Sequence, residues 1–471
     1  MNRLLFELRL IIRSRLSAGA LVLLLLLSAL AVWSGMREVE RQRQTIARLV
    51  PLHAQDVAAL AARHPDSANA GSAAYYTFYD TWDAPTDAAF LALGLRDVAP
   101  YVLRVRALGL QAQLYEGETF NPEIALPGRF DFAFVLIYLA PLFVIALLHD
   151  LVSGERQSGR LRMLLAMPGA RGLWRRRAAL RGALLFACLA LPASAGAAWS
   201  GTGIGGAATV LAVTAAYLAF WVGLSLLVAA RGWHSVANAM ALMGAWTVLT
   251  LVLPALANVA LIRAIPVHQG VDLMLAQREA VHGAWEIPRD ETMRRFLAGH
   301  PQWRDTAPLP ALFHWKWYFA FHQLGDESVA GAVRDYRDGL LARQAWTGRL
   351  GWLLPGVGAQ GVLHRLANTD LPAQLAYQDG IAAHHKAIRE FYYGYLFNER
   401  RFGTADFARR PAFAPAAPQT SVPWRDAGAL FLLAGAVLLA GVAGLGRLGL
   451  YGGRPRGGKR QGGALPRREL S

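Results

Sequence analysis

Cysteine and lysine are nearly absent from this chain. Cys188 is the only cysteine among 471 residues and lies in an apolar run, which excludes an intrachain disulfide and a cysteine-cluster metal site. The only lysines are Lys316, Lys386 and Lys459, so arginine carries the formal net charge of +16. Charged residues make up 17% of the chain, against about 25% in a typical soluble protein. With 54% hydrophobic residues and a mean hydropathy of +0.28, the composition indicates a membrane protein with sizeable polar regions.

Motifs of nucleotide, zinc-protease and serine-hydrolase chemistry are also missing. The stretch from Gly453 to Lys459 imitates the spacing of a P-loop, but Arg460 stands where the Mg²⁺-binding Ser or Thr must be. Neither H-E-x-x-H nor G-x-S-x-G occurs. His384 and His385 resemble a metal pair, but His385 falls on an apolar helical face, which favours a packed histidine. The sequence predicts no cofactor, no metal and no enzymatic activity of the chain itself.

Six apolar stretches are long enough to cross a bilayer, whose core needs about 20 apolar residues as a helix. Their interiors hold essentially no Asp, Glu, Lys or Arg, which argues against an ion-coupled transporter and a proton channel. The first stretch has a cleavable signal peptide as its alternative, but its length and the lack of an A-x-A site favour an uncleaved anchor. The six predicted spans are residues 16–33, 130–148, 182–199, 207–230, 236–262 and 427–446.

Arginines beside these stretches predict the topology. Basic residues gather in residues 1–15, in the loop 149–181, at Arg231 and in the tail 447–471. Such clusters mark the cytoplasmic side, so both termini are expected in the cytoplasm. Because the basic residues flank apolar runs, they indicate the lipid bilayer rather than nucleic acid as a partner. The expected fold is an all-α polytopic membrane protein with six transmembrane helices and two large, mainly helical external segments.

The two external segments would be residues 34–129 and 263–425. The first contains an aromatic group from Tyr75 to Trp82, which belongs either at the membrane interface or in a small core. The second contains a stripe with helical spacing, and four prolines predict an extended linker before the last span. The stripe comprises Leu375, Ile381, His385, Ile388, Tyr392 and Tyr395, and the prolines are Pro411, Pro415, Pro418 and Pro423.

The loop 149–181 is the most informative segment. Eight arginines lie between Arg156 and Arg181. Within the loop, residues 149–168 predict one short amphipathic helix, with leucines on one face, Glu155 and Arg156 near its start, and Pro168 ending it. The leucines are Leu161, Leu164 and Leu165. A helix of this kind between two spans is a candidate docking surface for a soluble partner, and Gly159 is expected to allow that partner's close approach.

The same loop resembles the cytoplasmic segment of ABC-2 type exporter permeases. That family's pattern is roughly E-[RK]-x-x-G-[TS]-L-x-x-L-L-x-x-P, and Arg160 here replaces the usual small hydroxyl residue. The matching residues are Glu155, Arg156, Gly159, Leu161, Leu164, Leu165 and Pro168. The resemblance implies a transmembrane subunit of an ATP-driven exporter in the bacterial inner membrane. It also implies two partners: a separate ATPase subunit on the cytoplasmic face, and a second permease chain, identical or a sister.

A second likeness covers more of the chain. The insertions after the first span and before the last resemble a bacterial subfamily of these permeases with an uncharacterised external domain. The run from Asn368 to Leu371, followed by Gln374, Tyr377 and His384, is similar to a helical element of that subfamily. Two alternatives from other classes stay open: a membrane-anchored binding or assembly protein that acts through the outer segments, and an integral membrane enzyme that uses external histidines and acids.

Overall fold

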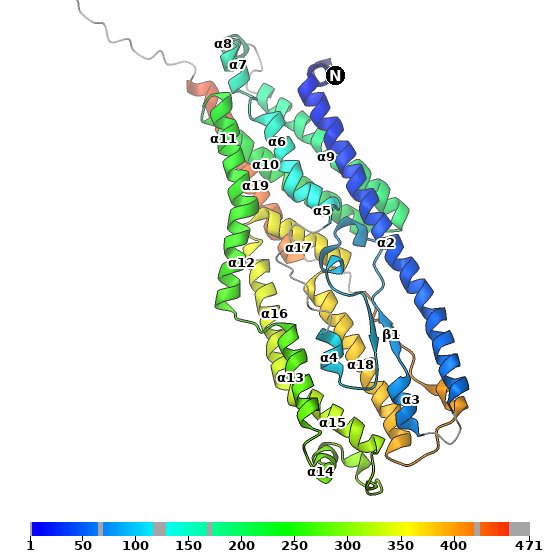
Figure 1. Ribbon diagram of the computed structural model, residues 1–471. Coiled ribbons are helices and arrows are strands. Elements are labelled where there is room, and N and C mark those ends of the chain that lie inside the picture. Colours follow the sequence, from blue (N-terminus) through cyan, green and yellow to red (C-terminus); the bar gives the residue numbers. More distant parts are fainter. Residues whose placement is uncertain (1, 65–68, 116–128, 167–171, 419–423, 452–471) are drawn as a thin grey trace, which may run out of the picture.

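The computed structural model describes residues 2–64, 69–115, 129–166, 172–418 and 424–451. The described chain is mostly helical and forms an elongated molecule with two parts (Figure 1). A bundle of long helices occupies one half. A lobe of shorter helices, built from the segments that precede the second and the last span, occupies the other.

Six helical runs are long and apolar enough to span a membrane, which confirms the six predicted stretches. A short helix α1 (Asn2–Arg13) precedes the first, and Ser14 caps the start of the next helix. The runs are α2 (Arg15–Arg63), α5 to α7 (Phe132–Gln157), α9 (Leu173–Ser200), α10 (Ile204–Ala230), α11 to α12 (Ser235–Ala264) and α19 (Trp424–Tyr451).

Helix α2 belongs to both parts of the molecule. Its 49 residues give a length of about 73 Å, more than twice the roughly 30 Å of a bilayer core. The apolar part ends near Trp33, and the helix continues without a break through Pro51 to Arg63 in the lobe. The bundle and the lobe therefore share one rigid element, seen along one side in Figure 1.

Close helix packing in the bundle depends on glycine. A Cβ on Gly223 of α10 would lie 2.6 Å from the Cα of Leu438 in α19, and one on Gly441 would lie 2.4 Å from the carbonyl oxygen of Gly223. Small residues let membrane helices approach this closely. The bundle core around this crossing is apolar, with Trp221 and Tyr217 among its largest buried side chains.

Two of the long runs contain a wide π-helical turn just before a proline. The turn η3 (Val135–Leu139) joins α5 (Phe132–Phe134) to α6 (Ala140–Leu148), and Pro141 follows it. The turn η5 (Thr247–Val252) joins α11 (Ser235–Trp246) to α12 (Leu253–Ala264), and Pro254 follows it. Proline has no N–H and its ring crowds the carbonyl four residues earlier, which widens the preceding turn.

The lobe is a helical body with one short antiparallel ladder that the sequence analysis did not predict. Strands β1 (Tyr79–Trp82) and β2 (Val102–Val105) pair with Tyr79 opposite Val105. The helices of the lobe are α3 (Ala70–Tyr76), α4 (Leu110–Tyr115), α13 (Gly270–Gly283), α14 (Arg289–Gly299), α15 (Trp315–Ser328), α16 (Ala330–Leu350) and α18 (Leu371–Leu396). Tyr79 is buried in the apolar core that they form, so the aromatic group of the first segment contributes to a core.

Helix α18 runs through the lobe and confirms the predicted stripe. Leu375, Ile381, His385, Ile388 and Tyr392 are all buried, and Tyr395 is half-buried. After η7 (Thr404–Arg409), residues 411–418 form neither helix nor strand, as expected for a proline-rich linker. Pro423 and the tail from residue 452 lie outside the described residues.

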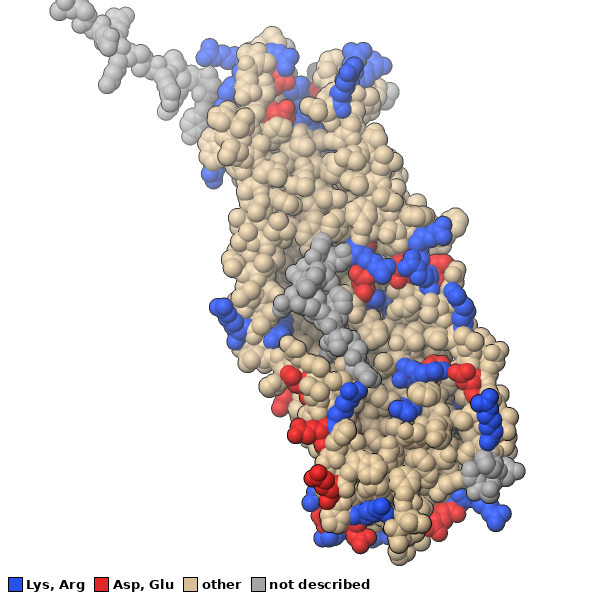
Figure 2. All heavy atoms as spheres, in the orientation of Figure 1, with Lys and Arg blue, Asp and Glu red and all other residues tan. Residues whose placement is uncertain are grey.

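Charge and tryptophan distribution mark the two ends of the bundle. On the face that Figure 2 shows, the bundle has a band without Lys, Arg, Asp or Glu, with charged residues at its outer end and over the lobe. Exposed tryptophans lie where the bundle meets the lobe, and the indole of Trp352 donates to Asp426 in the first turn of α19 (3.4 Å). This arrangement is typical of a bilayer interface. The exposed tryptophans at this level are Trp33, Trp199, Trp346, Trp352 and Trp424.

Candidate functional site

The end of the bundle opposite the lobe carries α1, the start of α9 and the segment singled out in the sequence (Figure 1). The structure resolves that segment into two short helices, α7 (Ser153–Gln157) and α8 (Leu161–Ala166), where the sequence predicted one. Gly159 causes the break. Its φ of +72° is left-handed, a conformation that ends a helix and that glycine adopts without strain. Pro168 lies outside the described residues.

A cluster of four charged residues, which we call the charge cluster, fixes α7 to its neighbours. The Glu155 carboxylate accepts hydrogen bonds from Arg177 of α9 (2.8 Å) and from Arg160 (2.9 Å). The Arg177 Nε also donates to both oxygens of Glu7 in α1 (3.1 and 3.0 Å). Arg177, Glu7 and Glu155 have side chains only 14–16% exposed, so these ion pairs are partly shielded from water. Glu155 is therefore paired within its own chain.

A second set of polar contacts ties α7 to the next pair of spans. The Arg156 guanidinium donates to the carbonyl of Gly232, in the turn between α10 and α11. The hydroxyls of Ser153 and Ser235 are 2.8 Å apart, and Asn238 of α11 donates to the carbonyl of His149 (3.1 Å). Asn238 is 1% exposed, and its Oδ1 has no hydrogen-bond partner among the described residues.

Two leucines of α8 face the bundle. Leu161 and Leu164 are half-buried and pack against the bundle core, and the side chain of Leu165 is not among those described. Arg160 and Arg162 are exposed, and Met163 is 56% exposed. Among the described side chains of α8, the surface left for a partner is therefore basic, with Met163 as its large exposed apolar group, and the predicted role of Leu165 stays a prediction.

Gly159 has a conformational role inside the chain, and the close approach of a partner at this position stays a prediction. A Cβ built on it would meet nothing within 4 Å of its own chain. Its left-handed φ explains the glycine without any close contact inside the chain. Gly232 has the same kind of φ (+72°), and in addition the Arg156 guanidinium lies 2.9 Å from where its Cβ would be.

Sequence reasoning missed Arg177, Glu7, Ser235 and Asn238 as members of this site. Glu7 carries the one available signal, since it is the only acid among the arginines of the first 15 residues. Arg177 lies in a run of three arginines that are equivalent in the sequence, and only the packing of α9 shows which of them meets Glu155.

The run from Asn368 to Asp370 forms the corner between α17 (Pro355–Ala367) and α18, close to where the lobe meets the bundle. Asn368 ends α17 with a left-handed φ of +55°, and Asp370 caps α18 by accepting from the backbone N–H of Ala373 (3.2 Å). The Thr369 hydroxyl donates to the carbonyl of Ala92 (2.8 Å), and the N–H of Leu95 in η2 (Gly94–Asp97) donates to the Thr369 carbonyl (2.9 Å). The motif therefore has a structural role: it shapes the turn from α17 to α18 and fastens it to residues 92–95.

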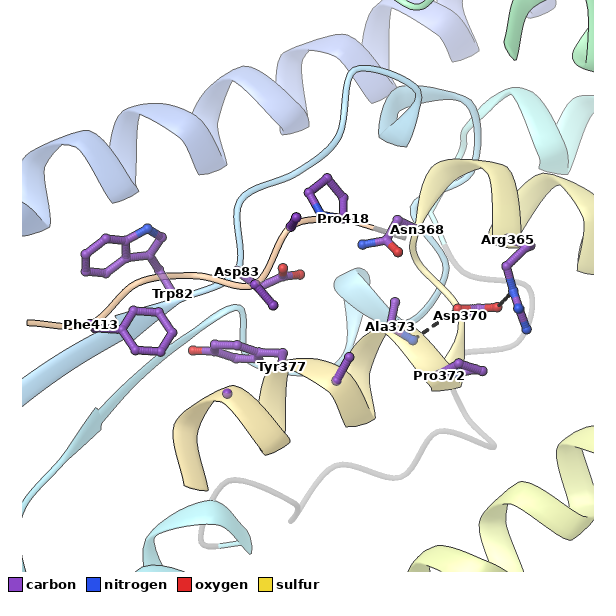
Figure 3. Close-up of a pocket in the computed structure, with 14 residues that line it drawn as sticks. Trp82, Asp83, Arg365, Asn368, Asp370, Pro372, Ala373, Tyr377, Phe413 and Pro418 are labelled. Atoms are coloured by element: carbon purple, nitrogen blue, oxygen red, sulfur yellow. Dashed lines mark hydrogen bonds and ion pairs between the residues drawn. The ribbon is translucent and has the colours of Figure 1, made fainter. Parts of the chain in front are cut away.

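A small pocket lies over this corner (Figure 3). Asp370 binds Arg365 on one side of it, while Trp82, Tyr377 and Phe413 line the other side. Its volume of about 50 Å³ has room for little more than water. His384 packs against Phe413 and Tyr79, with ring centroids 5.4 and 5.7 Å away. Among the described residues no group of three or more His, Cys, Asp or Glu could hold a metal ion.

Comparison with known proteins gives one match, and it covers the second large segment. Residues 272–416 match the family model described as Domain of unknown function (DUF3526). The match runs from α13 to the proline-rich linker, so it includes α17, the Asn368 corner and α18. No curated protein and no solved structure matches the chain.

Proposed function

We propose that this chain is the transmembrane subunit of an ATP-driven exporter of the ABC-2 type, and that a separate ATPase docks on α7 and α8. One observation carries the proposal: the short helices α7 and α8, which we call the hairpin, lie between two long apolar helical runs and are tied by polar contacts to α9 and to the α10–α11 turn. The resemblance of residues 155–168 to the family's cytoplasmic segment supports the same assignment. Hydrolysis of ATP would take place on the partner.

The contacts of α7 suggest how force from a partner would reach the spans. Through Glu155 and Arg177 the hairpin is joined to α9 and α1, and through Arg156 and Gly232 it is joined to the α10–α11 turn. A push on α8 would therefore move both groups of helices together as a rigid body. A second permease chain, identical or a sister, would complete the path.

The proposal includes an orientation. The starts of α1 and α9, the hairpin and the end of α19 lie at one end of the bundle, where Gly446 comes close to Arg175. We propose that this end is cytoplasmic, that both termini lie there, and that the lobe is external in the bacterial inner membrane. Alkaline phosphatase fused after Gly172 should be inactive, and after Gly325 it should be active. The reverse pattern would contradict the orientation.

The docking test uses two exposed apolar side chains at opposite ends of the molecule. Tagged chain is purified from its native cells in mild detergent, and the bound proteins are identified by mass spectrometry. We expect a P-loop ATPase without spans, and we expect Met163→Asp to lower its recovery about ten-fold because one exposed anchor dominates such a contact. Leu312→Asp, in the lobe and 81% exposed, is the matched control and should recover as much ATPase as wild type.

One observation favours the second candidate, a binding or assembly protein that acts through the lobe. Leu312, Phe313 and Trp285 are all exposed, and both aromatic rings pack on Trp317. If Leu312→Asp removes a co-purifying protein, while Met163→Asp changes nothing and no P-loop ATPase is found, this second function replaces the first.

A further inference from the structure

A large groove opens on the side of the bundle between α2 and α9, at the end next to the lobe. Its volume of about 790 Å³ falls in the range of small-molecule sites, roughly 300–1,000 Å³. Trp33 and Trp199 lie on its walls, and they are 55% and 84% exposed. The groove is distinct from the candidate docking surface, which is at the opposite end of the same helices.

Phe90 packs tightly against both helices where they approach each other beside the groove. A Cβ on Gly196 of α9 would lie 2.7 Å from the Phe90 ring and 2.7 Å from Val32, and one on Gly35 of α2 would lie 2.1 Å from the Phe90 carbonyl oxygen. Phe90 belongs to η1 (Ala89–Leu91) and is 1% exposed. Because Phe90 is buried in tight contact with both helices, the position of α2 relative to α9 is fixed at the groove.

The lining changes character along the groove. The wall formed by Ala29, Val32, Pro192 and Ala195 is apolar and belongs to the stretches long enough to span a membrane. The other end holds Arg37, Glu40 and Arg43, one to three turns beyond Trp33 on α2. Apolar walls at membrane depth that lead to charged groups at the interface match the shape of an amphiphile.

The charged end favours an anion. The Arg37 guanidinium lies over the Trp33 ring, 5.3 Å from its centroid, and has no carboxylate partner among the described residues. Arg43 pairs with Asp87 at 2.7 Å but is still 39% exposed. Glu40 accepts a hydrogen bond from Gln44 (2.7 Å), so Arg37 is the guanidinium at the opening that no described carboxylate holds.

We propose that this groove binds an anionic membrane amphiphile, with a hydrocarbon chain between α2 and α9 and its acidic headgroup on Arg37. The membrane-level walls supply the apolar contact, and the unpaired guanidinium supplies the headgroup selectivity. The proposal does not depend on the exporter assignment, because it concerns binding by this chain alone.

The test is native mass spectrometry of the delipidated full chain in detergent, with phosphatidylglycerol and phosphatidylcholine of identical acyl chains as probes. Wild type should carry phosphatidylglycerol about five-fold more tightly, and Arg37→Gln should remove that difference. Arg41→Gln, one turn further along α2, paired with Glu38 and outside the groove, should leave the difference unchanged.

A second pair of variants tests the location. Ala195→Trp fills the groove and should weaken binding of both lipids, whereas Ala198→Trp, exposed on the same helix but outside the groove, should not. Equal binding of the two lipids by wild type, or equal effects of the two tryptophans, would overturn the proposal. So would a disulfide between two copies of Trp33→Cys in a Cys188→Ala background, because a second chain would then cover the groove.

Discussion

The bundle and the lobe differ in how many charged groups they bury. In the bundle the buried groups are mostly neutral, and hydroxyls bond to their own helix: Thr214 donates to the Val210 carbonyl and Ser225 to the Trp221 carbonyl, both at 2.8 Å. In the lobe the buried groups include charged and ionisable side chains such as Arg389, Asp326 and Lys316, together with neutral threonines and glutamines. The difference shows what each part must satisfy. In the long helices nearly all backbone N–H and C=O groups bond within the helix, whereas the loops of the lobe have buried backbone groups that need side-chain partners.

The segment between β2 and α4 shows how buried charged side chains of the lobe bond backbone groups. Arg389 donates to the carbonyls of Ala107 (3.2 Å) and Leu108 (2.8 Å) and pairs with Asp326 at 2.8 Å. Asp326 in turn accepts from the backbone N–H groups of Leu110 (2.8 Å) and Gln111 (3.2 Å). Two buried charges from α15 and α18 thus hold a loop that contains little regular structure of its own.

The largest expected difference between the two parts is their response to acid. Burial, with Arg389 and Arg106 nearby, lowers the pKa of His322 to about 3, and burial, with His53 nearby, lowers the pKa of His384 to about 4. Burial also lowers the pKa of His385 well below its usual 6.5. Unfolded histidines take up protons below pH 6.5 while these stay neutral, so the lobe should lose stability as pH falls from about 6.5 towards 4.

The raised pKa values of Asp326 and Asp83, caused by burial, act in the opposite direction, but burial also lowers the pKa of His53 and of His314, so five histidines stand against two carboxyls. The predicted spans contain no histidine. Hydrogen exchange measured between pH 7 and 4.5, corrected for intrinsic rates, should show lobe peptides losing protection before bundle peptides. In His322→Gln, whose amide oxygen can replace the ring nitrogen that accepts from the Gly109 N–H (3.3 Å), the acid transition should move to lower pH. Simultaneous loss of protection in both parts would remove the distinction.

The next effect in size is the loss of a buried charge. Arg389→Met leaves the Asp326 carboxylate buried without its cation, which should destabilise the lobe by about 3–5 kcal/mol. Asp326→Asn in the same chain should recover part of this loss. Arg337→Met is the control, because its partner Asp379 is 64% exposed and such pairs contribute at most about 1 kcal/mol. Urea unfolding followed by lobe proteolysis measures all three, and equal midpoints for Arg389→Met and Arg337→Met would contradict the argument.

The sequence predicted the parts of the fold that follow from repeated local patterns. The six long helices and the buried face of α18 are encoded in apolar runs and helical spacing. The four-residue strands β1 and β2 are too short for such a pattern, and 19 residues separate them. The continuation of α2 beyond Trp33 was hidden by its charges and Pro51, which resemble a helix end in a linear sequence.

At the candidate site the sequence supplied residues but not their partners. It singled out Glu155, and the structure pairs it with Arg177 and, through that arginine, with Glu7, 170 positions from Arg177. Such a pairing depends on which helices adjoin, and no local pattern reports that. The Asn368 corner was likewise found as a motif, but its role became visible only when Thr369 met Ala92 across 277 positions.

The smallest expected effect concerns a backbone carbonyl of the bundle that a proline leaves without its helical hydrogen bond. Pro141 removes the N–H that would bond the carbonyl of Ile137, and the hydroxyl of Tyr217, which is fully buried, donates to that carbonyl at 2.8 Å. Tyr217→Phe should therefore cost about 1–2 kcal/mol, because it leaves the carbonyl unpaired in an apolar setting. Thr214→Ala, which removes a hydroxyl bonded only within its own helix, should cost less.

In a Pro141→Ala background the restored N–H can donate to the Ile137 carbonyl, so Tyr217→Phe should become nearly neutral. A double-mutant cycle in lipid, read by steric trapping, measures this coupling. Identical costs of Tyr217→Phe with and without Pro141 would show that the tyrosine packs at this turn without replacing the missing hydrogen bond.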